Sequence, residues 1–123
     1  MILVDSSIWI DHIRAPHELL ATLLARHEVI VHPFVIGEVA LGSIRNRNAI
    51  IASLEELPSA ELATDDEVLR LIEQHRLYGR GIGYVDAHLL AATRLTPATA
   101  LWTRDRRLRD IAAKLRLAAR LTH

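Results

Sequence analysis

The sequence predicts an α/β fold of three layers, α/β/α, in which helices cover both faces of a central, mostly parallel sheet of four or five strands. Two observations lead to this prediction. Short apolar runs alternate along the chain with segments of helical periodicity, which is the pattern of consecutive βαβ units. No repeat, low-complexity tract or Gly/Ser-rich linker interrupts this alternation, so we expect residues 1–123 to form a single domain.

The first half of the chain alternates strand and helix twice. The opening run ILV is short and wholly apolar, which indicates a strand that is buried on both faces, and VIVH has the same character. Pro33 is favoured in the first turn of a helix and opens FVIGEVALGSIR, whereas Pro58 ends the helical segment before it. We expect strands at 2–4 and 29–32, and helices at 6–14, 18–26, 34–45 and 46–57.

The second half continues the alternation. Thr64 and Glu67 have the spacing of a capping box, which predicts that a helix begins at TDDE. The segment RGIG is rich in glycine and predicts a flexible loop before the helical run YVDAHLLAATRL. We expect strands at 60–63, 100–103 and 117–121, and helices at 68–77, 84–95 and 105–115.

Composition limits the class of protein. Half of the 123 residues are hydrophobic, but only five are aromatic (two Trp, two Tyr and one Phe), so the core must be aliphatic. The absence of cysteine excludes disulfides, thiolate metal sites and cysteine nucleophiles. No apolar stretch is long enough to cross a bilayer, and we expect a cytoplasmic protein without a membrane partner.

Fifteen acidic and fifteen basic residues cancel, but they are unevenly placed. Residues 55–73 contain seven acids and one base, whereas residues 94–123 contain eight bases and two acids. A basic patch suits a polyanion such as nucleic acid, while a neutral total argues against tight, nonspecific coating of one.

Four carboxylates stand out because they interrupt apolar surroundings. Asp5 directly follows an expected strand and Asp105 follows another after Arg104, while Glu38 and Asp86 are the acids of two apolar helical runs. Helix capping by Asp5 or Asp105, and interaction of Asp86 with the helix dipole, are plain alternatives for each residue taken singly. However, the ends of parallel strands share one edge of a sheet, so these side chains can converge there.

Converging carboxylates repel one another unless divalent cations bridge them. Oxygen-only ligands suit Mg²⁺, for which Mn²⁺ can substitute, rather than zinc. Such a site can lower the pKa of bound water and neutralise charge on a phosphodiester. We therefore interpret Asp5 as a metal ligand in preference to a simple cap.

The series LVDSS, IGEVALG, YVDAHLLAA and LWTRD is similar, in order and spacing, to the PIN-domain ribonucleases, and most similar to the VapC-type toxins of toxin–antitoxin pairs. The resemblance covers essentially the whole chain. It implies a PIN-like fold, Mg²⁺-dependent endonucleolytic cleavage of RNA, a homodimer, and neutralisation by a cognate antitoxin that inserts a segment near the active site.

The same resemblance implies roles for individual residues. Asp5, Glu38, Asp86 and Asp105 correspond to the acidic quartet of that family, with Asp105 either binding metal or orienting water. Ser6 and Thr103 match the hydroxyl residues that accompany the first and last acids, and we expect both to contact substrate.

Arg80 and His88 lie near Asp86 in the sequence. Arg80 is in the glycine-rich loop and could reach a substrate phosphate, or could serve only to solubilise a turn. His88 follows Asp86 by two positions, which places it on another side of the helix, and we interpret it as a packing or surface residue.

Two other classes of α/β protein also place an Asp after the first strand, but the residues of this chain do not fit them. A haloacid-dehalogenase-like phosphatase would have a second Asp where Ser7 stands, and a receiver domain would have a Lys after a late strand, whereas the one Lys of the chain, Lys114, is in a helical segment. A non-catalytic PIN-fold module that binds RNA or a protein is the remaining alternative. Metal binding without turnover would distinguish it.

Overall fold

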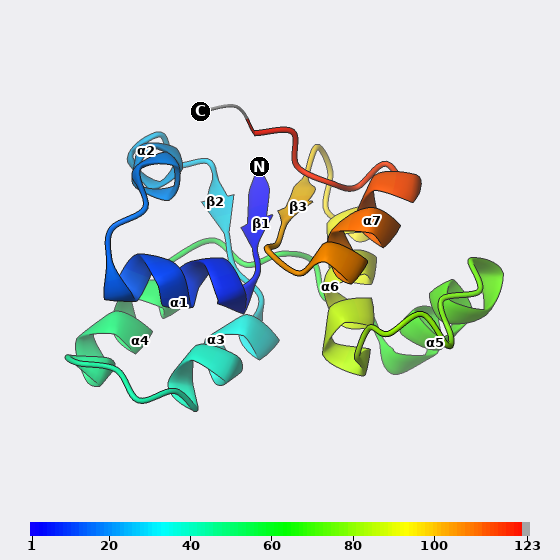
Figure 1. Ribbon diagram of the computed structural model, residues 1–123, viewed down its shortest axis with the longest axis horizontal. Coiled ribbons are helices and arrows are strands. Elements are labelled where there is room, and N and C mark those ends of the chain that lie inside the picture. Colours follow the sequence, from blue (N-terminus) through cyan, green and yellow to red (C-terminus); the bar gives the residue numbers. More distant parts are fainter. Residues whose placement is uncertain (122–123) are drawn as a thin grey trace.

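The computed structural model describes residues 1–121 and has a small parallel sheet at its centre (Figure 1). Its strands lie in the order β2-β1-β3, with all pairings parallel. The strands are β1 (Ile2–Val4), β2 (Val29–Ile30) and β3 (Ala100–Trp102). The helices are α1 (Ser6–Arg14), α2 (Glu18–Ala25), α3 (Pro33–Ala40), α4 (Arg47–Glu55), α5 (Asp65–Gln74), α6 (Tyr84–Leu95) and α7 (Arg106–Lys114).

Helices flank the sheet, as the alternating pattern predicts. Helices α1 to α4 lie on the β2 side of the sheet and α5 to α7 on the β3 side (Figure 1). The core between them is mainly aliphatic, and its fully buried members include Leu3, Leu89, Leu101 and Val35. This agrees with the low aromatic content of the chain.

The number of strands is lower than predicted. The expected strands at 60–63 and 117–121 reach the sheet only as isolated bridges, Val31 to Ser59 and Leu101 to Ala118. Each makes two backbone hydrogen bonds and then leaves the sheet; beyond Ala60, for instance, the next backbone N–H donates to the Thr96 hydroxyl at 2.9 Å. The two segments therefore border the sheet at β2 and β3 without extending it.

Helix α3 is shorter than the predicted helix at 34–45, because it ends at Ala40. The carbonyl of Ala40 accepts hydrogen bonds from Nε and Nη2 of Arg47, at 3.0 and 2.9 Å, which satisfies an acceptor at the end of the helix.

The capping box of α5 is confirmed: the Thr64 hydroxyl accepts from the Glu67 N–H at 3.1 Å, and Glu67 Oε1 accepts from the Thr64 N–H at 2.9 Å.

Strand register determines what meets at the carboxyl edge of the sheet. Val4 pairs with Trp102, and the Asp5 N–H donates to the Trp102 carbonyl at 2.9 Å. Asp5 and Thr103 consequently follow their strands side by side.

Within the described part of the chain, no helix has the length and apolar character that spanning a membrane requires.

Candidate active site

Asp5 lies just beyond β1 and is 6% exposed. Its Oδ1 accepts from the Ser6 N–H at 2.7 Å, which makes Asp5 the N-cap of α1. Its Oδ2 accepts from the hydroxyls of Thr103 at 2.7 Å and Ser7 at 3.3 Å. These hydrogen bonds offset the cost of burying a carboxylate. The capping alternative is thus correct, because Asp5 caps α1 through Oδ1.

Thr103 connects Asp5 with Asp105. The Thr103 side chain is 5% exposed, and its hydroxyl accepts from the Asp105 N–H at 3.0 Å while donating to Asp5. Asp105 is the N-cap of α7, and its Oδ1 accepts from the N–H groups of Arg107 and Leu108 at 2.9 and 3.1 Å. One hydroxyl therefore fixes the relative positions of two predicted site residues.

Asp86 is half-buried in the first turn of α6, and its Oδ2 accepts from the Gly83 N–H at 3.0 Å. Desolvation raises the pKa of Asp86, the Gly83 hydrogen bond lowers it, and the charges of Asp5 and Asp105 raise it further. The pKa of Asp86 is raised overall. Asp86 therefore senses the two acids that follow β1 and β3.

Glu38 lies on α3, which starts almost directly after β2, and its side chain is exposed. Its pKa is raised, mainly by desolvation, and the charges of Asp5 and Asp86 add to the rise, while a hydrogen bond with the Ser6 side chain opposes it. Ser6 Oγ also lies 3.5 Å from Asp5 Oδ1, so this hydroxyl stands between Glu38 and Asp5.

The four carboxylates thus interact electrostatically at one edge of the sheet, and Asp86 is coupled to each of the other three. Within residues 1–121, no three acidic or imidazole side chains are grouped closely enough to bind one metal ion together. The donor set is nevertheless the hard-oxygen type, and the mutual repulsion of partly desolvated carboxylates is what a divalent cation relieves.

The other predicted residues lie around this group. Arg80 is half-buried in the loop before α6 and forms no ion pair with a carboxylate in the described part of the chain. His88 is buried against Phe34 and Tyr84, with Nε2 3.2 Å from Asp65 Oδ1, so its interpretation as a packing residue is confirmed. Ser7, which the sequence analysis did not assign to the site, was detectable as the second hydroxyl of LVDSS.

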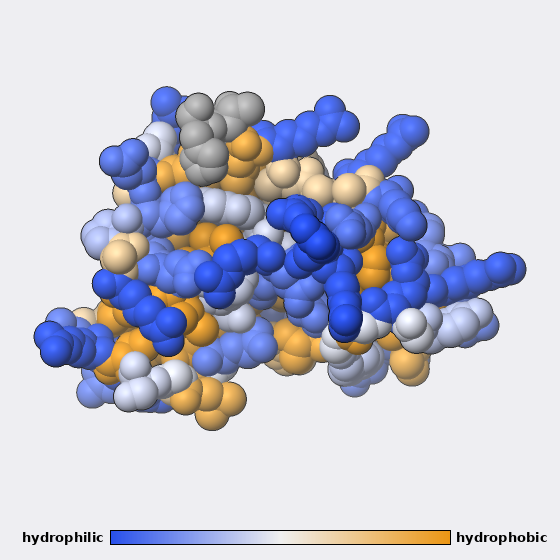
Figure 2. Space-filling view, in the orientation of Figure 1, coloured by the Kyte–Doolittle hydropathy of each residue, from blue (hydrophilic) through white to orange (hydrophobic). Residues whose placement is uncertain are grey.

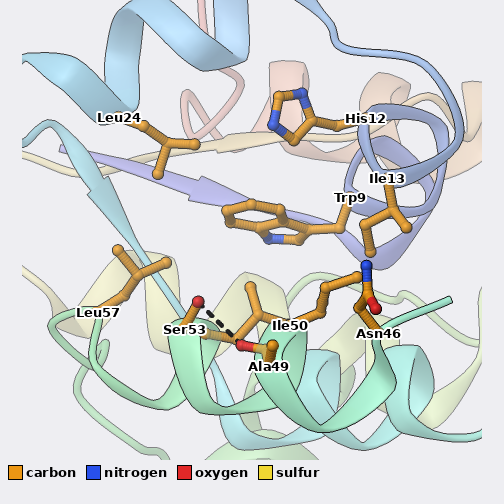
Figure 3. A pocket seen from close by; sticks show the side chains of 10 residues that line it. Trp9, His12, Ile13, Leu24, Asn46, Ala49, Ile50, Ser53 and Leu57 are labelled. Atoms are coloured by element: carbon orange, nitrogen blue, oxygen red, sulfur yellow. Dashed lines mark hydrogen bonds between the residues drawn. The ribbon is translucent and has the colours of Figure 1, made fainter. Parts of the chain in front are cut away.

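A separate groove of about 460 Å³ lies between α1, α2 and α4 (Figure 3). The indole of Trp9 reaches into it from α1, facing Ile50 and Ser53 of α4. Trp9 is 4% exposed, and its Nε1 has no hydrogen-bond partner among residues 1–121. A neighbouring hollow shares Ile50 with this groove and adds Arg14 and Arg45.

Comparison with known proteins gives two results. The chain matches the PIN domain family over residues 2–114. It is also 48% identical over 114 residues to "Ribonuclease VapC32" of Mycobacterium tuberculosis, both from strain CDC 1551 / Oshkosh and from strain ATCC 25618 / H37Rv, in an alignment that covers 93% of this chain and 92% of that protein. The residues matched to the family include the positions of all four carboxylates.

Proposed function

The chain belongs to the PIN domain family and is of the VapC type, and on that premise we propose that it is a Mg²⁺-dependent endoribonuclease, the toxin of a cytoplasmic toxin–antitoxin pair. The observation that supports this most is the electrostatic coupling of Glu38 and Asp86 to Asp5 at the carboxyl edge of a parallel sheet. Ligands of open α/β sheets bind at this edge.

We propose that Asp5 and Asp86 hold the metal ion, with Glu38 and Asp105 completing the site directly or through water. Mg²⁺ is usually bound by one or two carboxylates and several waters, so two of these carboxylates would be enough to hold it, and Mn²⁺ would replace it. When bound, the ion would acidify a water molecule and offset charge on the phosphodiester.

The protein's own groups prepare this site. The hydroxyls of Ser7 and Thr103 orient Asp5, and Thr103 also holds the backbone of Asp105. Asp105 uses Oδ1 for its cap, and Oδ2 has no donor among the described residues, so this oxygen is available to a ligand or to a water molecule. We place Ser6 and Thr103 at the border of the substrate site, where their role is to position carboxylates as well as to contact RNA.

Cleavage of a mixed RNA pool, with and without Mg²⁺, tests the proposal directly. We expect Asp5→Asn to reduce cleavage by about 100-fold or more, the scale seen when one preorganised electrostatic group is removed from an active site. Asp110→Asn, at an exposed acid of α7, is the matched control and should cleave normally.

The alternative, a module that binds RNA or a protein without catalysis, predicts another pattern. The wild-type chain would then bind Mg²⁺, measurable by calorimetry, but would cleave no more RNA than Asp5→Asn. Equal activity of the wild-type and Asp5→Asn proteins would indicate a contaminating nuclease and would remove support for the proposal.

We assign the apolar groove to a segment of the antitoxin. Apolar side chains of the segment would cover Ile50 and the apolar lining around it, and acidic residues would suit the adjoining Arg14 and Arg45.

We further propose that α3 contributes to a homodimer interface. Leu41, directly after α3, is 90% exposed and Phe34 is 41% exposed, and both lie on the side of the helix that carries Gly37. A methyl group added at Gly37 would meet nothing within 4 Å, so another helix could approach the backbone closely there.

A further inference from the structure

The side chain of Arg107 rests on Gly81. A Cβ added to Gly81 would lie 2.6 Å from Nη1 and 2.7 Å from Cδ of Arg107, both impossibly short. Gly81 also has φ +82°, a left-handed conformation that disfavours other residues. Glycine is therefore favoured at position 81 by its backbone conformation, and a Cβ added there would displace the Arg107 side chain.

On each side of this contact, a nearby backbone N–H group donates to a carboxylate of the proposed site. The Arg107 N–H donates to Asp105 Oδ1 at 2.9 Å, in the first turn of α7. Gly83, two residues after Gly81, donates its N–H to Asp86 Oδ2 at 3.0 Å. The Arg107 side chain thus lies between the start of α7 and the loop before α6, in a region where hydrophilic side chains stand beside paler and apolar ones (Figure 2).

The guanidinium of Arg107 nevertheless has no acceptor of its own, since no ion pair or hydrogen bond to it is formed within residues 1–121. Arg104, by contrast, pairs with Asp11 at 2.8 Å, and Arg47 donates to the Ala40 carbonyl. A guanidinium has five N–H donors in a planar fork that matches a phosphate. Arg107 is exposed, its side chain lies against Gly81, and its donors remain available.

We propose that Arg107 binds a phosphate of the RNA strand beside the acidic site, and that Gly81 is the platform that holds its guanidinium there. The inference rests on the proposed function and extends it to the contact with substrate. Four acids repel a polyanion, and a fixed cation next to them offsets that repulsion and sets the position of the strand.

RNA binding in the non-cleaving Asp5→Asn background tests the proposal without requiring turnover. The probe is a labelled single-stranded RNA of random sequence, and its Kd is measured by fluorescence anisotropy at several salt concentrations. We expect Arg107→Ala to weaken binding about fivefold to tenfold for all sequences and to reduce the salt slope by roughly 0.7, the value for one phosphate contact on a single strand. Arg107→Lys should recover only part of the affinity, because it keeps the charge but not the fork.

Three matched variants make the test specific. Gly81→Ala should reproduce the loss of Arg107→Ala, and the double variant should be no worse than either single one, because both remove the same contact. Gly79→Ala is the control for strain, since Gly79 has φ +70° but nothing within 4 Å of an added Cβ. Arg109→Ala removes an exposed arginine from another side of α7 and should have a smaller effect.

Unchanged affinity in Arg107→Ala, or an equal loss in Arg109→Ala or Arg80→Ala, would overturn the assignment. Cleavage assays on the same variants in the active chain separate this result from the proposed function. If the wild type cleaves and Asp5→Asn does not, the ribonuclease proposal stands whatever Arg107 does. If the wild type neither cleaves nor binds RNA, both proposals are wrong.

Discussion

Thr103 joins two site carboxylates through a single hydroxyl, which donates to Asp5 and accepts from the backbone of Asp105. The side chain is buried, so loss of the hydroxyl would leave the Asp105 N–H without its acceptor and Asp5 with one donor fewer. In the proposed site, Thr103 would act on the reaction by positioning these two carboxylates.

We expect Thr103→Val to lower RNA cleavage about 10- to 100-fold and to lower the free energy of unfolding by about 1–2 kcal/mol. Thr93→Val is the matched control: Thr93 is 1% exposed, but its hydroxyl donates only to the Leu89 carbonyl of the same helix, at 2.7 Å. Cleavage kinetics and thermal unfolding measure the two effects. An equal loss of cleavage in both variants would show that a buried threonine matters only for packing.

At the scale of the element, the start of α5 is fixed by its capping box and connected to α6. Asp65, the first residue of α5, accepts from the Tyr84 hydroxyl at 2.7 Å, and its Oδ1 lies 3.2 Å from His88 Nε2. The Tyr84 hydrogen bond is the largest cause of the lowered pKa of Asp65. The cap therefore helps to place α5 against the helix that carries Asp86.

We expect Thr64→Ala to cost about 1 kcal/mol, because it removes the acceptor of the Glu67 N–H, and to lower Tm by about 4 °C. Thr64→Ser should restore most of the loss. Thr22→Ala is the control, since Thr22 is exposed inside α2 and alanine has the higher helix propensity there. Differential scanning calorimetry measures the Tm of all three variants. An unchanged Tm in Thr64→Ala would mean that the cap at the start of α5 does not stabilise the fold.

At the scale of the whole molecule, the described residues form two surfaces with apolar side chains. One is the groove lined by Trp9 and Ile50, and the other is the side of α3 that carries Phe34, with Leu41 beyond its end. We assign the first to the antitoxin and the second to another copy of the chain. Separate surfaces allow the two assignments to be tested independently.

We expect Ile50→Arg to weaken antitoxin binding about 100-fold or more, because a charge would be buried in an apolar contact, and to leave the dimer intact. Leu41→Arg should give a monomer that still binds antitoxin. Each variant is the control for the other, with light scattering for mass and protection from RNA cleavage as the measurements. A monomeric wild type would contradict the dimer assignment. If the antitoxin blocked RNA cleavage by Ile50→Arg as fully as cleavage by the wild type, the assignment of the groove would be wrong.

The sequence determined the α/β class, the aliphatic core, the main strands and the capping box of α5, because each follows from local patterns of apolar residues and caps. It could not determine how far the bordering segments at 59–60 and 117–119 pair with the sheet, nor that α3 ends at Ala40. Those outcomes depend on contacts with distant residues, such as Thr96 for the chain after Ala60 and Arg47 for the end of α3.

The four candidate acids were recognisable from the sequence because an acid in an apolar run, or directly after a strand, is unusual. Only the tertiary structure decided that Thr103 joins Asp5 to Asp105, that Ser6 lies between Asp5 and Glu38, and that Arg107 rests on Gly81. The physical reason is that these contacts connect residues far apart in the chain. Strand register and helix packing bring them together, and no local pattern of residues encodes that register.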